Sequence, residues 1–114
     1  MPYLRIQSNV SIDSAKEQSV LTKISTTIAE QLEKPLRYMM AGIDTDCTMM
    51  LGGSSDPLAF VELKGLAFPE SRTAELSGTL CELLQAELGI PQNRIYIVFS
   101  NVPRDMWGWN GGTF

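Results

Sequence analysis

The sequence has 114 residues, which suits one compact domain, and its 44% hydrophobic and 19% charged residues are typical of a globular protein. The net charge of −4 disfavours a nucleic-acid partner, and no stretch is long and apolar enough to span a membrane. The first residues lack a secretory pattern, so we expect a cytoplasmic location, with secretion by another route left open.

The first half of the chain predicts a strand, a helix and a second strand. Apolar residues recur at helical spacing from Val20 to Leu32. The expected elements are a strand over 3–7, a helix that Ser11 or Asp13 caps and Pro35 ends, a buried strand over 38–43, and a glycine-bearing loop over 44–57 that could hold a brief strand at 48–51.

The second half repeats this order with an offset of about 56 residues, so that Val20 corresponds to Leu76 and Pro35 to Pro91. The first strands of the two halves do not align at that offset. The expected elements are a strand over 58–66, a helix that Pro69 and Glu70 open and Gly89 and Pro91 end, and a strand over 94–99.

Two βαβ units predict an α/β fold in a single domain over 1–114, with a four-stranded sheet and both helices on one face. The strands over 38–43 and 94–99 are apolar at successive positions, so both of their faces favour burial. Two helices cover only one face. We therefore expect the second face to meet other copies of the same chain in an obligate homo-oligomer.

The chain contains no histidine, which excludes Ser-His-Asp and Cys-His catalysis and histidine metal ligands. An enzyme working near neutral pH would need a shifted carboxylate, a shifted lysine or the amino terminus as its proton carrier. Removal of Met1 would expose the secondary amine of Pro2, and burial or a nearby lysine would lower its pKa. Many proteins begin with Met-Pro, so Pro2 alone is a weak signal.

Other polar and aromatic residues have ordinary structural interpretations. Lys34 suits a helix C-terminus but could also bind a substrate carboxylate. Tyr38 and Tyr96 lie in strand-like runs, and the loop over 52–57 is typical of turns more than of an anion-binding nest. Cys47 and Cys81 match no zinc or redox motif. The aromatic residues of the tail should pack on a neighbour or line a pocket: Trp107, Trp109 and Phe114.

Taken together, several short motifs make the whole chain resemble the family of macrophage migration inhibitory factor and D-dopachrome tautomerase, in the tautomerase superfamily. Each motif is weak alone, but their order and spacing are specific. They are Met1-Pro2, Lys34-Pro35 with Tyr38, GGSSDP at 52–57, RIYI at 94–97 and GWNGGTF at 108–114.

The resemblance implies a homotrimer whose sheets enclose a central channel, with active sites between subunits and no cofactor or metal. It implies keto–enol tautomerisation of aryl 2-keto acids such as phenylpyruvate, with dopachrome derivatives as further substrates. Pro2 would be the catalytic base. The implied substrate-binding residues are Lys34 for the carboxylate, Leu66 through its backbone, Tyr96 from the adjacent subunit, and Tyr3, Tyr38, Val98, Trp109 and Phe114 in the pocket.

The chain departs from the family pattern in ways that bear on function. Val98 replaces a pocket asparagine, Trp107 a smaller valine, and Lys64 a histidine, which puts the substrate preference in doubt. The family's CxxC is absent. Ile12 replaces the arginine of the pseudo-receptor motif although its aspartate survives as Asp46, so receptor binding is poorly supported. A signalling or interaction protein with a vestigial site remains the alternative, and hydrolytic dehalogenation is a second one.

Overall fold

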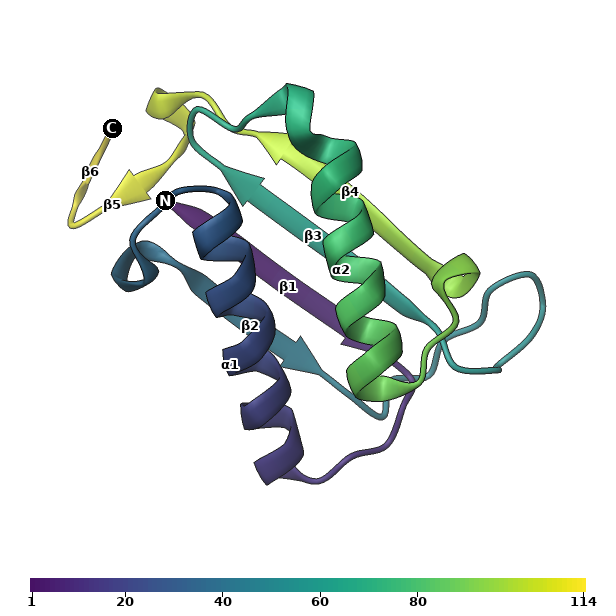
Figure 1. Ribbon diagram of the computed structural model, residues 1–114. Coiled ribbons are helices and arrows are strands. Elements are labelled where there is room, and N and C mark those ends of the chain that lie inside the picture. Colours follow the sequence, from purple (N-terminus) through teal and green to yellow (C-terminus); the bar gives the residue numbers. More distant parts are fainter.

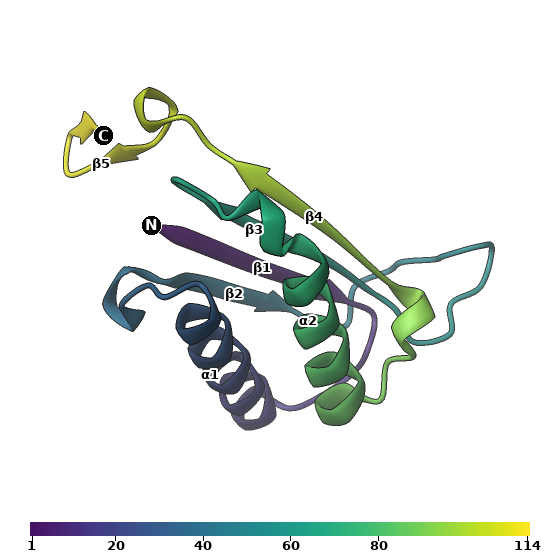
Figure 2. The same cartoon turned by 45° about the horizontal axis from the view of Figure 1, so that its top comes forward.

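The computed structural model, which describes residues 1–114, has two layers: a four-stranded sheet and two helices that pack on one of its faces. Figures 1 and 2 show this arrangement from two directions, with both termini at the same end of the molecule. Neither helix combines the length and the hydrophobicity needed to cross a bilayer. The strands of the sheet are β1 (Pro2–Ser8), β2 (Met40–Asp44), β3 (Ala59–Gly65) and β4 (Ile95–Asn101).

The sheet order β2-β1-β3-β4 confirms the two predicted βαβ units. The first unit pairs β1 and β2 in parallel, joined by α1 (Ser14–Gln31), and the second pairs β3 and β4 in parallel, joined by α2 (Thr73–Leu88). An antiparallel pairing of β1 with β3 connects the two units. As a result, β1 and β3 are the two central strands, and each has a neighbour on both edges.

Of the two predicted caps, Asp13 begins α1. Its carboxylate accepts a hydrogen bond from the backbone N–H of Lys16 at 2.7 Å, which satisfies one of the free donors at the helix start. Ser11 instead donates its hydroxyl hydrogen to the Asp46 carboxylate at 2.5 Å. The loop after β2 is thereby tied to the segment that precedes the helix.

The prediction that Pro35 ends α1 is wrong, because the helix stops at Gln31. Glu33 adopts a left-handed φ of 57°, and the N–H groups of Glu33 and Lys34 donate to the carbonyls of Glu30 and Ala29 at 3.0 Å each. This pair of bonds is a Schellman motif, here built on glutamate instead of glycine. It turns the chain before Pro35 is reached and fixes the backbone of Lys34.

Three further expectations need correction. Tyr38 lies in a 3-10 turn, Leu36–Tyr38, because its N–H donates to the carbonyl of Pro35 at 3.0 Å, so β2 begins at Met40. Residues 48–51 form no strand beyond a single bridge from Leu51 to Ser54. A 3-10 turn at Glu70–Arg72 precedes α2, which begins at Thr73 and ends, as predicted, at Gly89 in the left-handed conformation.

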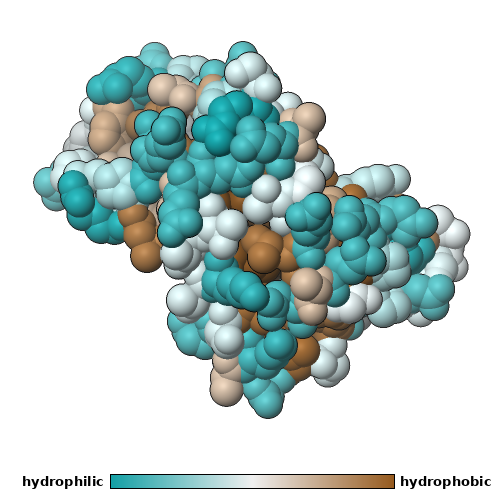
Figure 3. All heavy atoms as spheres, in the orientation of Figure 1, coloured by the Kyte–Doolittle hydropathy of each residue, from teal (hydrophilic) through white to brown (hydrophobic).

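The core lies between the helices and the sheet. Alternate residues of β1 and β3 face the helices, and the apolar stripes of α1 and α2 meet them. Hydrophilic side chains dominate the outer surface of the helical layer (Figure 3). The residues with no exposed surface include Leu4, Ile6, Ile24, Ile28, Val61, Leu63, Leu76, Leu80 and Leu84.

The opposite face of the sheet is uncovered in the single chain. Met40, Tyr96 and Val98 are 68%, 62% and 47% exposed, although their strands are the ones predicted to be apolar on both faces. Charged residues also lie on this side of the sheet, because Arg5 of the central strand β1 and Asp44 of its neighbour β2 form an ion pair of 3.3 Å. The uncovered face is therefore mixed in character, with apolar residues concentrated on its two edge strands.

The loop over 51–57 is organised by Arg94. Its guanidinium donates to the backbone carbonyls of Leu51, Ser54, Asp56 and Pro57 at 2.9–3.3 Å. The loop turns through two glycines with φ of 60° and 76°. Because its carbonyl oxygens converge on a cation, the loop fits the turn interpretation and not an anion-binding nest.

Replacing Arg94 by Lys should lower the free energy of unfolding by about 1–3 kcal/mol, because an ammonium group cannot reproduce a four-carbonyl contact made by a planar fork. Denaturant unfolding measures this loss. Arg104→Lys, at an exposed arginine with no side-chain hydrogen bond, is the matched control. Equal midpoints for both variants and the parent chain would contradict the role given to Arg94.

Candidate active site

Pro2 begins the central strand β1 at the end of the sheet where the two termini lie (Figure 1). Pro2 is buried and shares the helix-facing side of the strand with Leu4 and Ile6, whereas Tyr3 points to the uncovered face. The backbone of Pro2 lies opposite Gly65 of β3. The amino terminus is therefore held at the boundary between the two faces of the sheet.

Two hollows share Met1 and Pro2. The larger, which we call the aromatic hollow, has a volume of about 780 Å³ and lies toward the uncovered face. Nine of its thirteen lining residues are hydrophobic, and none is acidic. The aromatic hollow is lined by Met1, Pro2, Tyr3, Arg37, Tyr38, Met39, Met40, Lys64, Val102, Met106, Trp107, Gly108 and Trp109.

The smaller hollow, which we call the lysine cleft, lies toward the helices. It brings Lys34, from the segment after α1, to the segment that follows β3. Its lining residues are Met1, Pro2, Leu32, Lys34, Gly65, Leu66, Phe68 and Pro69. The cleft encloses only about 10 Å³, roughly the space of one water molecule, so it marks where Lys34 borders the amino terminus, and the aromatic hollow on the other side of Pro2 is the space large enough for a ligand.

The amino group of the untrimmed chain belongs to Met1, and its pKa is lowered from the ordinary value of an α-amine. Partial burial is the larger cause, since it disfavours the charged form, and the positive charge of Lys34 is the second. Both causes arise from the position at the end of β1. Removal of Met1 would leave the amine of Pro2 between the same two hollows.

Asn101, the last residue of β4, holds the segment over 66–70 that forms one side of the lysine cleft. Its side-chain carbonyl accepts from the N–H of Phe68, and its amide donates to the Glu70 carboxylate, both at 3.1 Å. Ala67, between Leu66 and Phe68, adopts a φ of 48° that is unfavourable for alanine. The contacts of Asn101 stabilise this strained turn beside Pro2.

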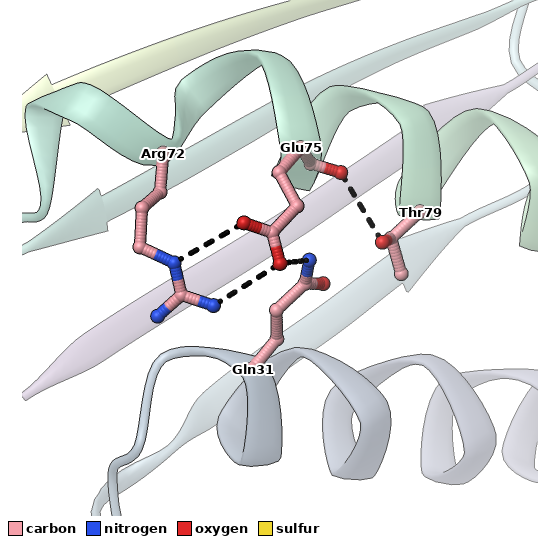
Figure 4. A network of polar contacts seen from close by, with 4 residues as sticks. All are labelled: Gln31, Arg72, Glu75 and Thr79. Carbon is pink, nitrogen blue, oxygen red and sulfur yellow. Dashed lines mark hydrogen bonds and ion pairs between the residues drawn. The ribbon is translucent and has the colours of Figure 1, made fainter.

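A polar network joins the helix ends that lead into the two sides of the cleft (Figure 4). Glu75 near the start of α2 accepts hydrogen bonds from Arg72 and, at 2.9 Å, from Gln31 at the end of α1. These donors, Arg72 first, lower the pKa of Glu75, and its carboxylate raises the pKa of Arg72. The network is a solvent-exposed link between the end of α1 and the start of α2, the two elements next to the segments that carry Lys34 and Leu66.

The C-terminal tail supplies the aromatic wall. Strands β5 (Gly108–Trp109) and β6 (Gly112–Thr113) form a hairpin, whose two central residues, Asn110 and Gly111, have φ of 50° and 81°. Positive φ at both positions is the pattern of a type I′ turn, which favours Asn-Gly. Of the three tail aromatics expected to pack on a neighbour or line a pocket, Trp107 and Trp109 line the aromatic hollow and Phe114 does not. Phe114 stacks on Trp109 with ring centroids 6.1 Å apart.

The structure brings most of the predicted site residues together around Pro2. Tyr3, Tyr38 and Trp109 line the aromatic hollow, and Lys34 and Leu66 line the lysine cleft. Tyr96 and Val98 lie on β4 and line neither hollow, and Phe114 lies behind Trp109. A single chain therefore does not bring these three to the lining around Pro2.

Arg37 lines the aromatic hollow and was not among the predicted site residues. It lies in the 3-10 turn that also carries Tyr38, and its guanidinium carbon is 4.7 Å from the centre of the Tyr38 ring. Sequence alone places Arg37 three residues after Lys34. That spacing, in a chain with an acidic net charge, is the one signal that could have indicated a second cation near the site.

Neither cysteine belongs to the site. Cys47 lies in the loop after β2, and Cys81 lies in α2, where it packs on the edge of the core. Burial raises the pKa of the Cys81 thiol, opposed in part by a hydrogen bond with Ser77, which reduces the thiolate population. No group of three or more Cys, Asp or Glu residues is placed to bind a metal ion.

Two βαβ units with a proline at the start of a central strand define a tautomerase-superfamily fold. Comparison with solved structures supports this class. A macrophage migration inhibitory factor homologue from Prochlorococcus marinus superposes with a TM-score of 0.91 at 39% identity, covering 98% of each chain. The factor from Trichinella spiralis gives a TM-score of 0.88 at 35% identity over 98% of this chain and 99% of that one.

The chain belongs to the macrophage migration inhibitory factor (MIF) family, whose model matches residues 1–114. Among characterised relatives, the homologue from Trichinella spiralis is 36% identical over 115 residues, covering all of both chains. The factor from Xenopus laevis is 32% identical over 117 residues, covering all of this chain and 99% of that one. The resemblance inferred from the sequence motifs is thereby confirmed.

Replacing Lys34 by Gln should raise the pKa of the amino group of the untrimmed chain, because a nearby positive charge opposes protonation and its removal favours it. The rate of reductive methylation of this amine as a function of pH measures the change. Lys23→Gln removes the same charge from the outer surface of α1 and should leave the pKa unchanged. An unchanged or lower pKa in Lys34→Gln would contradict the effect assigned to the Lys34 charge.

Proposed function

We propose that this chain, once Met1 is removed, catalyses keto–enol tautomerisation of aryl 2-keto acids with the Pro2 amine as its acid–base group. Dopachrome derivatives are further candidate substrates. The observation that carries the proposal is the position of Pro2 between a cleft with a lysine and a hollow with an aromatic wall. Membership of the MIF family supports a tautomerase more broadly.

In the proposed mechanism, Lys34 pairs with the substrate carboxylate and the aromatic ring occupies the hollow beside Tyr3 and Trp109. The neutral Pro2 amine removes the proton from the carbon next to the keto group, and the electron pair of that C–H bond forms the C–C double bond of the enol. The protonated Pro2 amine then gives this proton to the oxygen of the former keto group. A lowered amine pKa keeps the base neutral near pH 7 and able to act in both directions.

The substrate preference should differ from that of relatives with a polar group at the Val98 position. Val98 offers no hydrogen bond to a ring substituent. Trp107, which lines the aromatic hollow, is larger than the valine of the family pattern and narrows the space for the ring. We therefore expect no preference for a neutral ring hydroxyl over an unsubstituted ring.

We also propose that the active unit is a homotrimer. Its formation would bury the edge-strand residues Met40, Tyr96 and Val98, which a single chain leaves exposed. Burying this apolar surface favours association. Tyr96 of one subunit would then reach the site of its neighbour, which is consistent with its distance along the sheet from the hollows around Pro2 of its own chain.

Processed Pro2→Gly should lose at least about 100-fold in kcat/KM for phenylpyruvate, because glycine supplies a primary amine without the ring that positions the base. Ultraviolet absorbance of the enol measures the rate. A chain with Met1 retained, verified by intact mass, should be equally inactive because its proline nitrogen is acylated. Activity of Pro2→Gly within threefold of the parent chain would refute the mechanism.

Sedimentation at micromolar concentration should give a species of three chain masses. Two variants that are each impaired, Pro2→Gly by loss of the base and Tyr96→Ala by loss of a pocket contact, should complement each other. Refolding Pro2→Gly together with Tyr96→Ala creates sites that have Pro2 from one chain and Tyr96 from the next. In random mixtures of equal amounts about one quarter of the sites are intact. A monomer, or mixed trimers without restored activity, would argue against shared sites.

A further inference from the structure

The positive charges that lack a carboxylate partner are concentrated around the amino terminus. Most cations elsewhere on the chain have partners. Four of them form ion pairs: Arg5 with Asp44, Lys16 and Lys23 with Glu87, and Arg72 with Glu75. The guanidinium of Arg94 donates to backbone carbonyls. Lys34 and Arg37, which line the lysine cleft and the aromatic hollow, form no ion pair within 4.0 Å, and neither does Arg104, which lines neither hollow. In a chain of net charge −4, this distribution favours anions near Pro2.

Arg37 is held at the rim of the aromatic hollow with its donors available. Its guanidinium carbon lies 4.7 Å from the centre of the Tyr38 ring, and one terminal nitrogen donates to the Tyr38 hydroxyl at 3.5 Å, a long contact. The ring thus orients the guanidinium without using most of its five N–H groups. A planar fork in this state is suited to a carboxylate.

Lys64 supplies a second cation to the same hollow, from β3. It lies opposite Tyr3 in the sheet, and its amine is 3.9 Å from the Glu62 carboxylate, which is a long separation for an ion pair between two half-buried side chains. Glu62 does not line the hollow. The two cations therefore border a mainly apolar space that contains no carboxylate of its own.

The lysine cleft and the aromatic hollow place these positive charges on opposite sides of Pro2. Lys34 is in the cleft toward the helices, whereas Arg37 and Lys64 are in the aromatic hollow toward the uncovered face, and Pro2 borders both. A 2-keto acid whose carboxylate meets Lys34 and whose reacting carbon lies at Pro2 would direct its ring toward Arg37. The far end of the ring would then meet positive charge.

We propose that this site prefers aryl 2-keto acids that carry a second anionic group on the ring, bound by Arg37 with help from Lys64. The proposal rests on the proposed function for the direction in which the substrate lies. It adds a second charged contact at the end of the substrate remote from the keto acid.

The test compares ligand pairs that differ only in the second charge. In turnover the pair is 4-carboxyphenylpyruvate and phenylpyruvate. In binding the pair is 3-(4-carboxyphenyl)propanoate and 3-phenylpropanoate, which do not react. Both tryptophans of the chain line the aromatic hollow, so their fluorescence reports occupancy directly. In each case we measure a preference ratio: the kcat/KM or the binding affinity for the carboxylated compound, divided by the same quantity for the compound without the second carboxylate.

The processed parent protein should show a preference of about tenfold for the carboxylated member of each pair, which decreases as ionic strength rises. Arg37→Gln should lower this ratio about tenfold, Arg37→Lys should retain part of it, and Lys64→Gln should lower it less. Lys23→Gln, on the far surface of α1, is matched in charge and should leave the ratio within twofold.

The proposal is overturned if the parent protein binds both members equally, or if Arg37→Gln and Lys23→Gln give the same ratio. A loss of ratio in Lys23→Gln as well would indicate general attraction of anions and not a contact at Arg37. The binding pair needs no turnover. If phenylpyruvate is not tautomerised but the binding ratio behaves as described, the proposed function fails while this binding preference stands.

Discussion

The pairing of β1 on both of its edges is the constraint on which the site depends. Because β2 lies on one side and β3 on the other, the strand that begins at Pro2 cannot shift in register without breaking two ladders. Leu4 and Ile6, with no exposed surface, anchor it further to the core. A terminal residue, which in most proteins is mobile, is thereby placed with the accuracy of a central strand.

The ends of the two helices supply the surroundings of that residue. α1 stops early in a Schellman motif that fixes the backbone of Lys34, and the strained turn at Ala67, held by Asn101, fixes the opposite side of the cleft. The contact of Gln31 with Glu75 joins the two helices close to both segments. Because the position of each segment depends on a few polar contacts, the geometry of the cleft is sensitive to substitutions that do not touch the substrate.

Apolar periodicity and the helix stop at Gly89 were sufficient to predict the two βαβ units and the elements that carry Pro2, Lys34 and Leu66. The sequence could not predict that Glu33 would adopt a left-handed conformation, since glutamate is unfavourable there, so the end of α1 was placed too late. Nor could it predict the 3-10 turn that moves Tyr38 out of the strand and turns Arg37 toward the hollow. Both features are closed by local backbone hydrogen bonds, from Glu33 and Lys34 back into α1 and from Tyr38 to Pro35, which the apolar pattern of the sequence does not encode.

Tyr96 and Val98 illustrate a different limit. Their strand was predicted correctly, but their side chains lie on the uncovered face, and their part in the site depends on an arrangement of several chains. Strands that are apolar on both faces predict that several copies of the chain associate. They do not specify which residue of one copy reaches the amino terminus of the next.

Catalysis by the processed chain requires the Pro2 amine to be a base of lowered pKa. An NMR titration of protein labelled with ¹⁵N-proline measures that pKa directly and can be set beside the pH dependence of kcat/KM. We expect the same pKa in both experiments, below the ~8 of an ordinary α-amine. A Pro2 pKa at or above that value, or a kinetic pKa that does not match the titration, would contradict it.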